Sequence, residues 1–294
     1  MNRKKRSVIV ALYLALLIGW GLTAAEHGYT RQKKIGILLV TFGSSLPEAQ
    51  VSFENIDRKV KEAFPEVPVR WAYTSSIIRK KFAKQGKHLD SPEDALKKMK
   101  EEGFTHVAVQ SLHTISGEEY NDLLRSVQTF RDSDGFKDII VGYPLLSSQA
   151  DMVKMTKALL ANIPKERKKE EGVVFMGHGS PHPNNAFYAA LMFQIQRKDP
   201  NVFIGCVEGY PEIDVIKEML QEKKIKKVYL MPLMSVAGDH ARNDMAGRGE
   251  DSWVFVLNQA GIESIPILKG TAEYDNVVDI WVDHLREALG RFES

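Results

Sequence analysis

"HVAVQSLHTISGEEY" (residues 106–120) and "KVYLMPLMSVAGDHA" (residues 227–241) follow one pattern, and this likeness indicates how the chain folds. Each begins as an apolar strand, continues into a polar turn and reaches a glycine that is followed by an acidic residue. "LLVTFGSS" (38–45) matches "VFMGHGSP" (174–181) in the same sense, because each strand ends in Gly-Ser before a helix. The chain is therefore expected to contain one structural unit twice.

Short apolar runs alternate with amphipathic stretches along the rest of the chain. This alternation is typical of an α/β fold with parallel sheets. The expected strands are 34–42, 67–73, 106–112, 138–146, 173–177, 201–209, 227–234 and 262–268. The expected helices include 47–64, 118–130, 184–197, 211–222, 246–260 and 275–292. The last helix has one apolar stripe and should pack over core; the stripe consists of Val278, Trp281, Leu285, Leu289 and Phe292.

The repeat predicts two similar lobes, each with a mainly parallel four-stranded sheet flanked by helices, and a cleft between the lobes. The charged run at 165–171 indicates the boundary, so the lobes are expected at residues 26–168 and 169–294. The first half carries an additional stretch at 77–91. Chance agreement between two ordinary strand–helix patterns is the alternative to a true duplication.

The first 25 residues have the features of a secretory signal. Four cations, Arg3 to Arg6, precede an apolar run from Ser7 to about Leu22, and small residues follow as far as Ala25. The run is long for a signal and short for a membrane span, so an uncleaved anchor is the alternative. An exported, periplasmic protein is expected, anchored in the membrane only if the leader is not cleaved.

Charge and cysteine content exclude several classes of protein. Without the leader, 36 Lys and Arg face 38 Asp and Glu, a net charge of about −2, which argues against nucleic-acid binding. Cys206 is the only cysteine, so internal disulfides and cysteine-based metal sites are excluded.

Three polar residues follow successive strands of the second half. His178 follows the first strand, Glu208 the second and His240 the third, and glycines flank them. Because ligands of open parallel sheets bind outside the carboxyl ends of the strands, these side chains should converge at one edge. Two imidazoles and a carboxylate without a thiol suit a borderline divalent ion such as cobalt, nickel, iron or zinc. The sequence therefore predicts one metal site.

Each of these residues also has a simpler interpretation. A histidine at a strand end can be a hydrogen-bonded turn residue, and Glu208 can cap the helix near Pro211. The first half has no such triad, since its corresponding positions hold Phe42, about Tyr73, and Glu119. The site is thus expected once.

Further histidines differ in what their positions indicate. His113 closes the third strand of the first half and is a candidate for substrate contact. His182 lies between two prolines, which favours a loop-shaping role, whereas His88 and His284 are expected at the solvated surface.

Residues that follow His240 are expected to orient its ring, as metal-ligating imidazoles require. They are Arg242, Asn243 and Asp244.

"FMGHGSPHPNNAFY" (175–188), "GCVEGYPEID" (205–214) and above all "MPLMSVAGDHARNDMAGRGEDSW" (231–253) resemble the class II tetrapyrrole chelatases. Within that class the likeness is greatest to the sirohydrochlorin cobaltochelatases of anaerobic cobalamin synthesis, and it covers essentially the whole mature chain. The resemblance implies a two-lobed α/β fold and insertion of Co(II) into sirohydrochlorin without ATP or another nucleotide. It also implies metal ligation by His178, Glu208 and His240.

Two features depart from that family. Most relatives are cytoplasmic, whereas this chain has a leader, and Arg248 lies in a segment that tends to be acidic in relatives. The expected partners are a small-molecule tetrapyrrole and a divalent metal as substrate, Co²⁺ with Fe²⁺ or Ni²⁺ as alternatives. A homo-oligomer is compatible with the sequence.

Metal insertion requires removal of water from the ion and of two protons from pyrrole N–H groups. An imidazole cannot hold metal and proton through one lone pair, so His178 and His240 are expected to alternate between these tasks while Glu208 balances charge.

Contacts with the substrate are expected from other residues. The apolar floor of the cleft is expected to consist of Phe42, Leu112 and Met234. Contact with substrate carboxylates is expected from Arg242, with Asn243, Arg79 and Lys80 as further candidates.

Two rival functions remain at this stage. One is an exported two-lobed protein that binds a tetrapyrrole, haem or metal without catalysis. The other is a chelatase that acts on Fe(II) or on haem.

Overall fold

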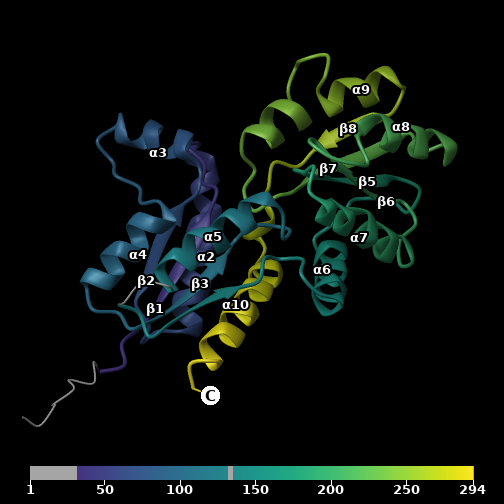
Figure 1. Ribbon diagram of the computed structural model, residues 1–294. Helices are drawn as coiled ribbons and strands as arrows, with labels where there is room; N and C mark the ends of the chain where they lie inside the picture. Colours follow the sequence, from purple (N-terminus) through teal and green to yellow (C-terminus); the bar gives the residue numbers. More distant parts are fainter. Residues whose placement is uncertain (1–31, 132–134, 294) are drawn as a thin grey trace, which may run out of the picture. The chain divides into compact units, whose positions relative to one another are not determined.

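The computed structural model describes residues 32–131 and 135–293, and these residues form two parallel four-stranded sheets (Figure 1). The strand order is β2-β1-β3-β4 in the first sheet and β6-β5-β7-β8 in the second. The strands of the first sheet are β1 (Ile35–Thr41), β2 (Val69–Tyr73), β3 (His106–Ser111) and β4 (Asp138–Gly142). Those of the second are β5 (Gly172–Gly177), β6 (Val202–Cys206), β7 (Lys227–Leu233) and β8 (Glu263–Pro266). All eight predicted strands are present, and the predicted fold class is confirmed.

The two sheets have equivalent topology. Each begins with a strand that becomes central, sends the second strand to one side and the third and fourth to the other. Figure 1 shows both sheets with helices against them. The repeat seen in the sequence thus corresponds to a repeat in the order of the strands.

Helices connect the strands. In the first half they are α2 (Gln50–Ala63), α3 (Ser76–Ala83), α4 (Pro92–Glu101) and α5 (Glu118–Arg131). The following ones are α6 (Gln149–Ala161), α7 (Ala186–Gln196), α8 (Ile213–Glu222), α9 (Trp253–Gln259) and α10 (Asp275–Gly290). Short helical turns complete the set: η1 (Pro47–Ala49), η2 (Pro183–Asn185), the π-helical η3 (Ala241–Met245) and η4 (Thr271–Glu273).

The helix predicted at 246–260 is shorter than expected. It begins only at Trp253, where the Ser252 hydroxyl accepts a hydrogen bond from the amide of Phe255. Before it, the amide of Gly247 bonds to the carbonyl of Asn243 and closes η3. A Cβ at position 247 would lie 2.1 Å from that carbonyl oxygen, so the chain requires glycine there and turns where a longer helix was predicted.

The strands owe their apolar runs to burial on both faces. Every residue of β5 is buried, and Ile37 to Val40 of β1 have no exposed surface. Helices cover both faces of a parallel sheet, which is why its strands read as continuous rather than alternating hydrophobic segments. This double burial made the strands recognisable in the sequence.

Helix α10 contacts elements of the first sheet although it ends the chain. It lies against α2, β3 and β4, while α6 contacts both α10 and α7 (Figure 1). The expected apolar stripe is buried, with Val278 and Leu285 fully and Trp281 almost fully inaccessible. The expected boundary between the lobes, at residues 168–169, lies between the two sheets in the sequence. Helix α10 follows this boundary in the chain but packs on the first sheet.

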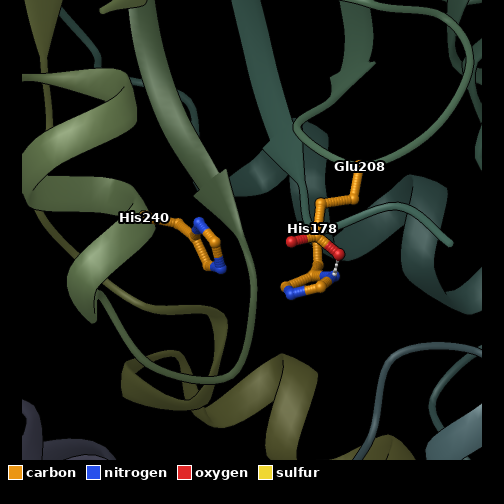
Figure 2. A group of neighbouring side chains, drawn as sticks. All are labelled: His178, Glu208 and His240. Carbon is orange, nitrogen blue, oxygen red and sulfur yellow. Dashed lines mark ion pairs between the residues drawn. The ribbon is translucent and has the colours of Figure 1, made fainter.

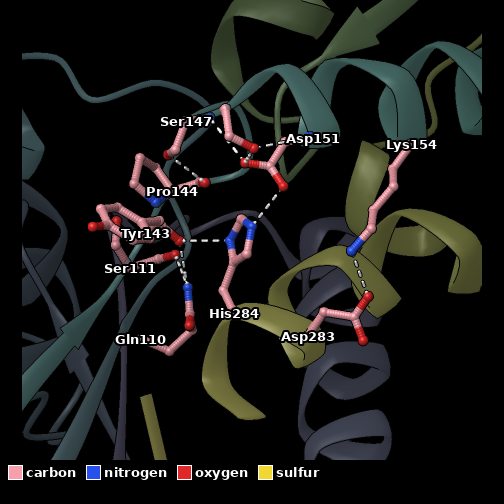
Figure 3. A network of polar contacts seen from close by, with 10 residues as sticks. Gln110, Ser111, Tyr143, Pro144, Ser147, Asp151, Lys154, Asp283 and His284 are labelled. Carbon is pink, nitrogen blue, oxygen red and sulfur yellow. Dashed lines mark hydrogen bonds and ion pairs between the residues drawn. The ribbon is translucent and has the colours of Figure 1, made fainter. Parts of the chain in front are cut away.

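The prediction that His284 lies at the solvated surface is wrong. The residue is 5% exposed and joins α10 both to α6 and to the segment between β4 and α6 (Figure 3). Its Nδ1 lies 3.0 Å from the carbonyl oxygen of Tyr143, and its Nε2 lies 2.9 Å from Oδ1 of Asp151. The partner is 133 residues away in the sequence, so no local pattern could reveal it. His88, by contrast, is exposed as expected.

Within residues 32–131 and 135–293, no helix combines the length and the apolar character that crossing a bilayer requires. The predicted leader lies outside the described residues. The compact unit begins at Lys33.

Candidate metal centre

His178 is the first residue after the buried strand β5. The loop that follows lies so close to the loop after β6 that a Cβ at Gly179 would be 2.7 Å from the amide nitrogen of Gly209. Gly179 also has a φ of +83°, a conformation that favours glycine. The glycine beside His178 therefore permits two loops to meet backbone to backbone, and the imidazole next to it is partly exposed.

Glu208 stands beside His178 because the pairing of β5 and β6 continues into the loops. The amide of Val207 donates to the carbonyl of Gly177, and the amide of Glu208 donates to the carbonyl of His178 at 2.7 Å. The N-cap of α8 is Glu212 rather than Glu208. The helix-capping interpretation of Glu208 is thus excluded, and its carboxylate is available to a ligand.

His240 comes from the loop after β7, immediately before η3. Its Nδ1 lies 2.5 Å from Oδ2 of Asp244, one turn further along. Of the three residues expected to orient this ring, only Asp244 does so: Nε of Arg242 donates to the carbonyl of Ala237, and Nδ2 of Asn243 donates to Asp239.

The three side chains converge from three neighbouring strand ends (Figure 2). One potential ligand atom from each of His178, Glu208 and His240 lies within 4.8 Å of the others. The centroids of the two imidazole rings are 4.8 Å apart, and the angle between the ring planes is 88°. Nδ1 of His178 lies 4.0 Å from Oε2 of Glu208. Their side chains are 47%, 58% and 32% exposed in chain order, so an incoming ion can reach them.

The hydrogen bonds of the two rings determine which nitrogen is free. Nδ1 of His178 lies 2.9 Å from the carbonyl oxygen of Gly179, and that of His240 faces the Asp244 carboxylate. Both partners only accept, so each Nδ1 carries the hydrogen and each Nε2 keeps its lone pair. Two Nε2 atoms and a carboxylate are a suitable donor set for a borderline divalent ion.

A second polar group comes from the first half of the chain. Oε2 of Glu119 accepts a 2.8 Å hydrogen bond from the Thr74 hydroxyl and lies 3.7 Å from Nε2 of His113. Nδ1 of His113 is 2.8 Å from the Ser111 hydroxyl, while its buried Nε2 has no hydrogen-bond partner. Nε2 of His113 is thus held in place next to the Glu119 carboxylate.

Contact with the His113 imidazole lowers the pKa of Glu119 below its ordinary value. Partial burial opposes this shift, and the Thr74 hydrogen bond and the charge of His178 add to it. Glu119 therefore remains ionised, and its carboxylate interacts electrostatically with His178. In the aligned repeats Glu119 occupies the position of His240, a signal that could have identified it as a candidate.

The predicted substrate contacts fall into different environments. Phe42 follows β1 and is 49% exposed, and Met234 packs partly against the second core. Leu112 is 2% exposed and belongs to the main hydrophobic core, so its expected place on the floor of a cleft is wrong. His182 caps η2 and lies 3.2 Å from the side-chain amide of Asn121, in agreement with the loop-shaping role.

Known proteins resemble this chain over most of its length. Residues 35–290 match the model of a family described as cobalt chelatase (CbiK). The chain is 48% identical to the sirohydrochlorin cobaltochelatase CbiKC of Nitratidesulfovibrio vulgaris, over 89% of this chain and 93% of the relative. It is 40% identical to the sirohydrochlorin cobaltochelatase of Salmonella typhimurium, over 87% of this chain and 97% of the relative.

Solved structures show the same fold at low sequence identity. SirB from Bacillus subtilis with Fe³⁺ has a TM-score of 0.58 at 16% identity and covers 88% of this chain and 97% of its own. CbiX, described as the terminal enzyme of sirohaem biosynthesis in denitrifying bacteria, has a TM-score of 0.56 at 14% identity, with 87% and 99% covered.

Proposed function

The chain belongs to the cobalt chelatase (CbiK) family, and from this premise we propose that it inserts Co(II) into sirohydrochlorin. It is a metal-inserting enzyme, since two relatives at 48% and 40% identity, matched over nearly their whole length, are sirohydrochlorin cobaltochelatases. The observation that carries the proposal is the convergence of His178, Glu208 and His240 at one edge of the second sheet.

These three residues are the proposed ligands of the incoming ion. Two neutral nitrogens and one carboxylate displace part of its water shell, and the absence of a thiolate keeps the ion exchangeable. Their exposure allows the macrocycle to approach from the solvent side. Sites of this type bind copper and nickel more tightly than cobalt, so cobalt is selected by metal supply and by the macrocycle.

His113 is the proposed acceptor of a pyrrole proton. His178 and His240 use Nδ1 in hydrogen bonds and need Nε2 for the metal, which leaves neither ring a lone pair while the ion is bound. Nε2 of His113 is unpartnered, and the ionised Glu119 beside it stabilises the imidazolium that forms. This division of tasks replaces the alternation between the two metal ligands that the sequence suggested.

Substitution of the ligands tests the proposal. His178→Ala and His240→Ala are each expected to reduce cobalt insertion by about 100-fold or more, because each removes one of three donors. Insertion is followed through the absorption of sirohydrochlorin after addition of Co(II). The thermal midpoint should change by only about 2 °C, since both side chains are partly exposed.

The exposed His88 provides the matched control, and His88→Ala should insert cobalt at the rate of the parent protein. A non-catalytic binder would change the spectrum stoichiometrically and then stop. Full turnover by both His178→Ala and His240→Ala would refute the assignment of the metal site.

We also propose that the protein is exported. The support is the sequence alone, namely the basic start and the apolar run of residues 1–25. N-terminal sequencing of the protein from a periplasmic fraction distinguishes a mature start near Glu26 from an uncleaved leader, and its recovery only from the cytosol would contradict export.

A further inference from the structure

Helix α3 and the loop behind it form an insertion at the edge of the first sheet. They occupy the chain between β2, which ends at Tyr73, and α4, which begins at Pro92. In the second half the corresponding connection runs from Cys206 to Ile213 and contains Glu208 but no helix. The insertion therefore stands at the carboxyl end of β2, the edge at which the other half places a proposed metal ligand.

The insertion is strongly basic and mostly exposed. No residue of α3 is buried, and Ile77, Lys80, Lys81 and Lys84 follow the i, i+3, i+4, i+7 spacing of one helix face. Lys87 extends the charge into the loop, and it is exposed as well. One side of the insertion thus presents a row of ammonium groups that begins at an exposed isoleucine.

The acidic groups nearest in sequence are already engaged. Asp90 pairs with Lys98 at 2.7 Å and lies 3.1 Å from His88, while Asp94 accepts hydrogen bonds from Ser91 in the cap of α4. Among the ion pairs of the described residues, none involves Lys80, Lys81 or Lys84. Elsewhere on the surface lysines such as Lys59 and Lys61 do have carboxylate partners. The charge of α3 is therefore available to an external anion.

The base of the insertion is fixed close to the site. Nη1 of Arg79 donates to the carbonyl of Thr74 at 2.8 Å, and the Ile78 side chain lies against Gly43, where a Cβ would be 3.2 Å from its Cγ2. The side chain of Thr74 donates to Glu119, whose pKa responds to the charge of His178. Two hydrogen bonds thus connect the foot of α3 to Glu119, while none of the ion pairs of the described residues involves the lysine face.

We propose that the lysine face of α3 receives the carboxylates at the rim of the tetrapyrrole and draws the substrate to the site. This inference rests on the proposed function, because sirohydrochlorin bears acetate and propionate groups around its whole periphery. Single exposed ion pairs contribute at most about 1 kcal/mol. Several cations beside a site act together on the rate of encounter, which falls as salt screens them.

The test uses two variants with the same change in charge. Lys80, Lys81 and Lys84 are replaced by glutamine in the first, and Lys165, Lys168 and Lys169 in the second. The control lysines are exposed in the segment before β5, at the amino end of the second sheet. Glutamine keeps helix propensity close to that of lysine, so circular dichroism and the thermal midpoint should remain those of the parent.

The α3 variant is expected to lose about tenfold in kcat/KM for sirohydrochlorin at low salt, with kcat little changed, because encounter rather than insertion is impaired. The difference should shrink toward 0.5 M salt, a concentration chosen because the Debye length there is only about 4 Å. Binding of uroporphyrin, a metal-free macrocycle with the same kinds of carboxylate, should weaken in parallel when measured by fluorescence. The control variant should match the parent protein in both assays.

Equal kcat/KM and equal uroporphyrin binding for the α3 and control variants would overturn the inference while leaving the proposed function intact. Loss of binding to phosphatidylglycerol vesicles, with unchanged uroporphyrin binding, would overturn it as well and assign the lysines to a membrane surface. Failure of the parent protein to insert cobalt would count against the proposed function alone, since uroporphyrin binding tests the α3 surface separately.

Discussion

Single hydrogen bonds determine what each histidine of the site can do. His178 and His240 are each fixed by a bond at Nδ1, and His113 is fixed at Nδ1 but has its Nε2 unpartnered beside Glu119. Three imidazoles of the same intrinsic chemistry are thereby suited to different proposed tasks, two as metal donors and one as a base. The division depends on which acceptor or donor each ring meets rather than on the ring itself.

His113→Ala tests the proposed role of His113 as the base. The variant is expected to bind Co(II) as tightly as the parent protein, because His113 is not among the proposed ligands. Its insertion rate should fall by about 10²-fold or more, since proton transfer loses its acceptor. Isothermal titration with Co(II) and the insertion assay separate these effects; a weakened cobalt affinity with a normal rate would contradict the proposed role.

Asp244→Asn tests the orienting contact of His240. The carboxylate at 2.5 Å fixes the orientation and tautomer of the ring, so its loss should weaken Co(II) binding by about 10- to 100-fold. Asp239→Asn is the control, because Asp239 bonds to Asn243 and has no hydrogen bond to His240. Equal cobalt affinities for the two variants would show that Asp244 does not support the metal site.

Among the elements, α10 is joined to α6 and to the segment before it by a buried polar contact of His284. The Tyr143 carbonyl only accepts, so Nδ1 of His284 carries a hydrogen, and the Asp151 carboxylate at Nε2 requires a second one. One proton is therefore held between His284 and Asp151. Asp151 also accepts from the Ser148 hydroxyl at the start of α6. Because Asp151 lies in α6, its contact with His284 joins two helices (Figure 3).

His284→Ala is expected to lower the free energy of unfolding by about 3 kcal/mol, because it leaves Oδ1 of the buried Asp151 without its partner. Urea denaturation followed by circular dichroism measures the change. His88→Ala, which removes an exposed imidazole, should change the same quantity by less than about 0.5 kcal/mol. Similar values for the two variants would mean that α10 is held by its apolar stripe alone.

For the molecule as a whole, the sequence was informative where structure is local or repeated. Strands buried on both faces read as apolar runs, and the rule that ligands gather at the carboxyl ends of parallel strands was enough to select His178, Glu208 and His240. The attachment of α10 to the first sheet was not predictable, because an apolar stripe shows that a helix packs but not against which partner. The pairing of His113 with Glu119 was missed for a related reason, since it requires the turn after β3 to bring α5 back to its strand.

The metal site should be coupled to the stability of the whole folded unit without being required for it. The proposed ligands are partly exposed and lie outside the hydrophobic clusters, so chelation with EDTA should leave the fold intact. Co(II) is expected to bind the folded state only, because residues so far apart in sequence cannot hold it in the unfolded chain. At about 100 times its dissociation constant it should therefore add about 2.7 kcal/mol.

For a unit of this size that stabilisation corresponds to an increase of roughly 5–10 °C in the thermal midpoint. Scanning calorimetry with and without Co(II) measures it, and His178→Ala with His240→Ala in one chain should abolish the increase while keeping the midpoint without metal. Unfolding by EDTA would show that the ion is a structural component, which is incompatible with an ion that must leave the protein in every turnover.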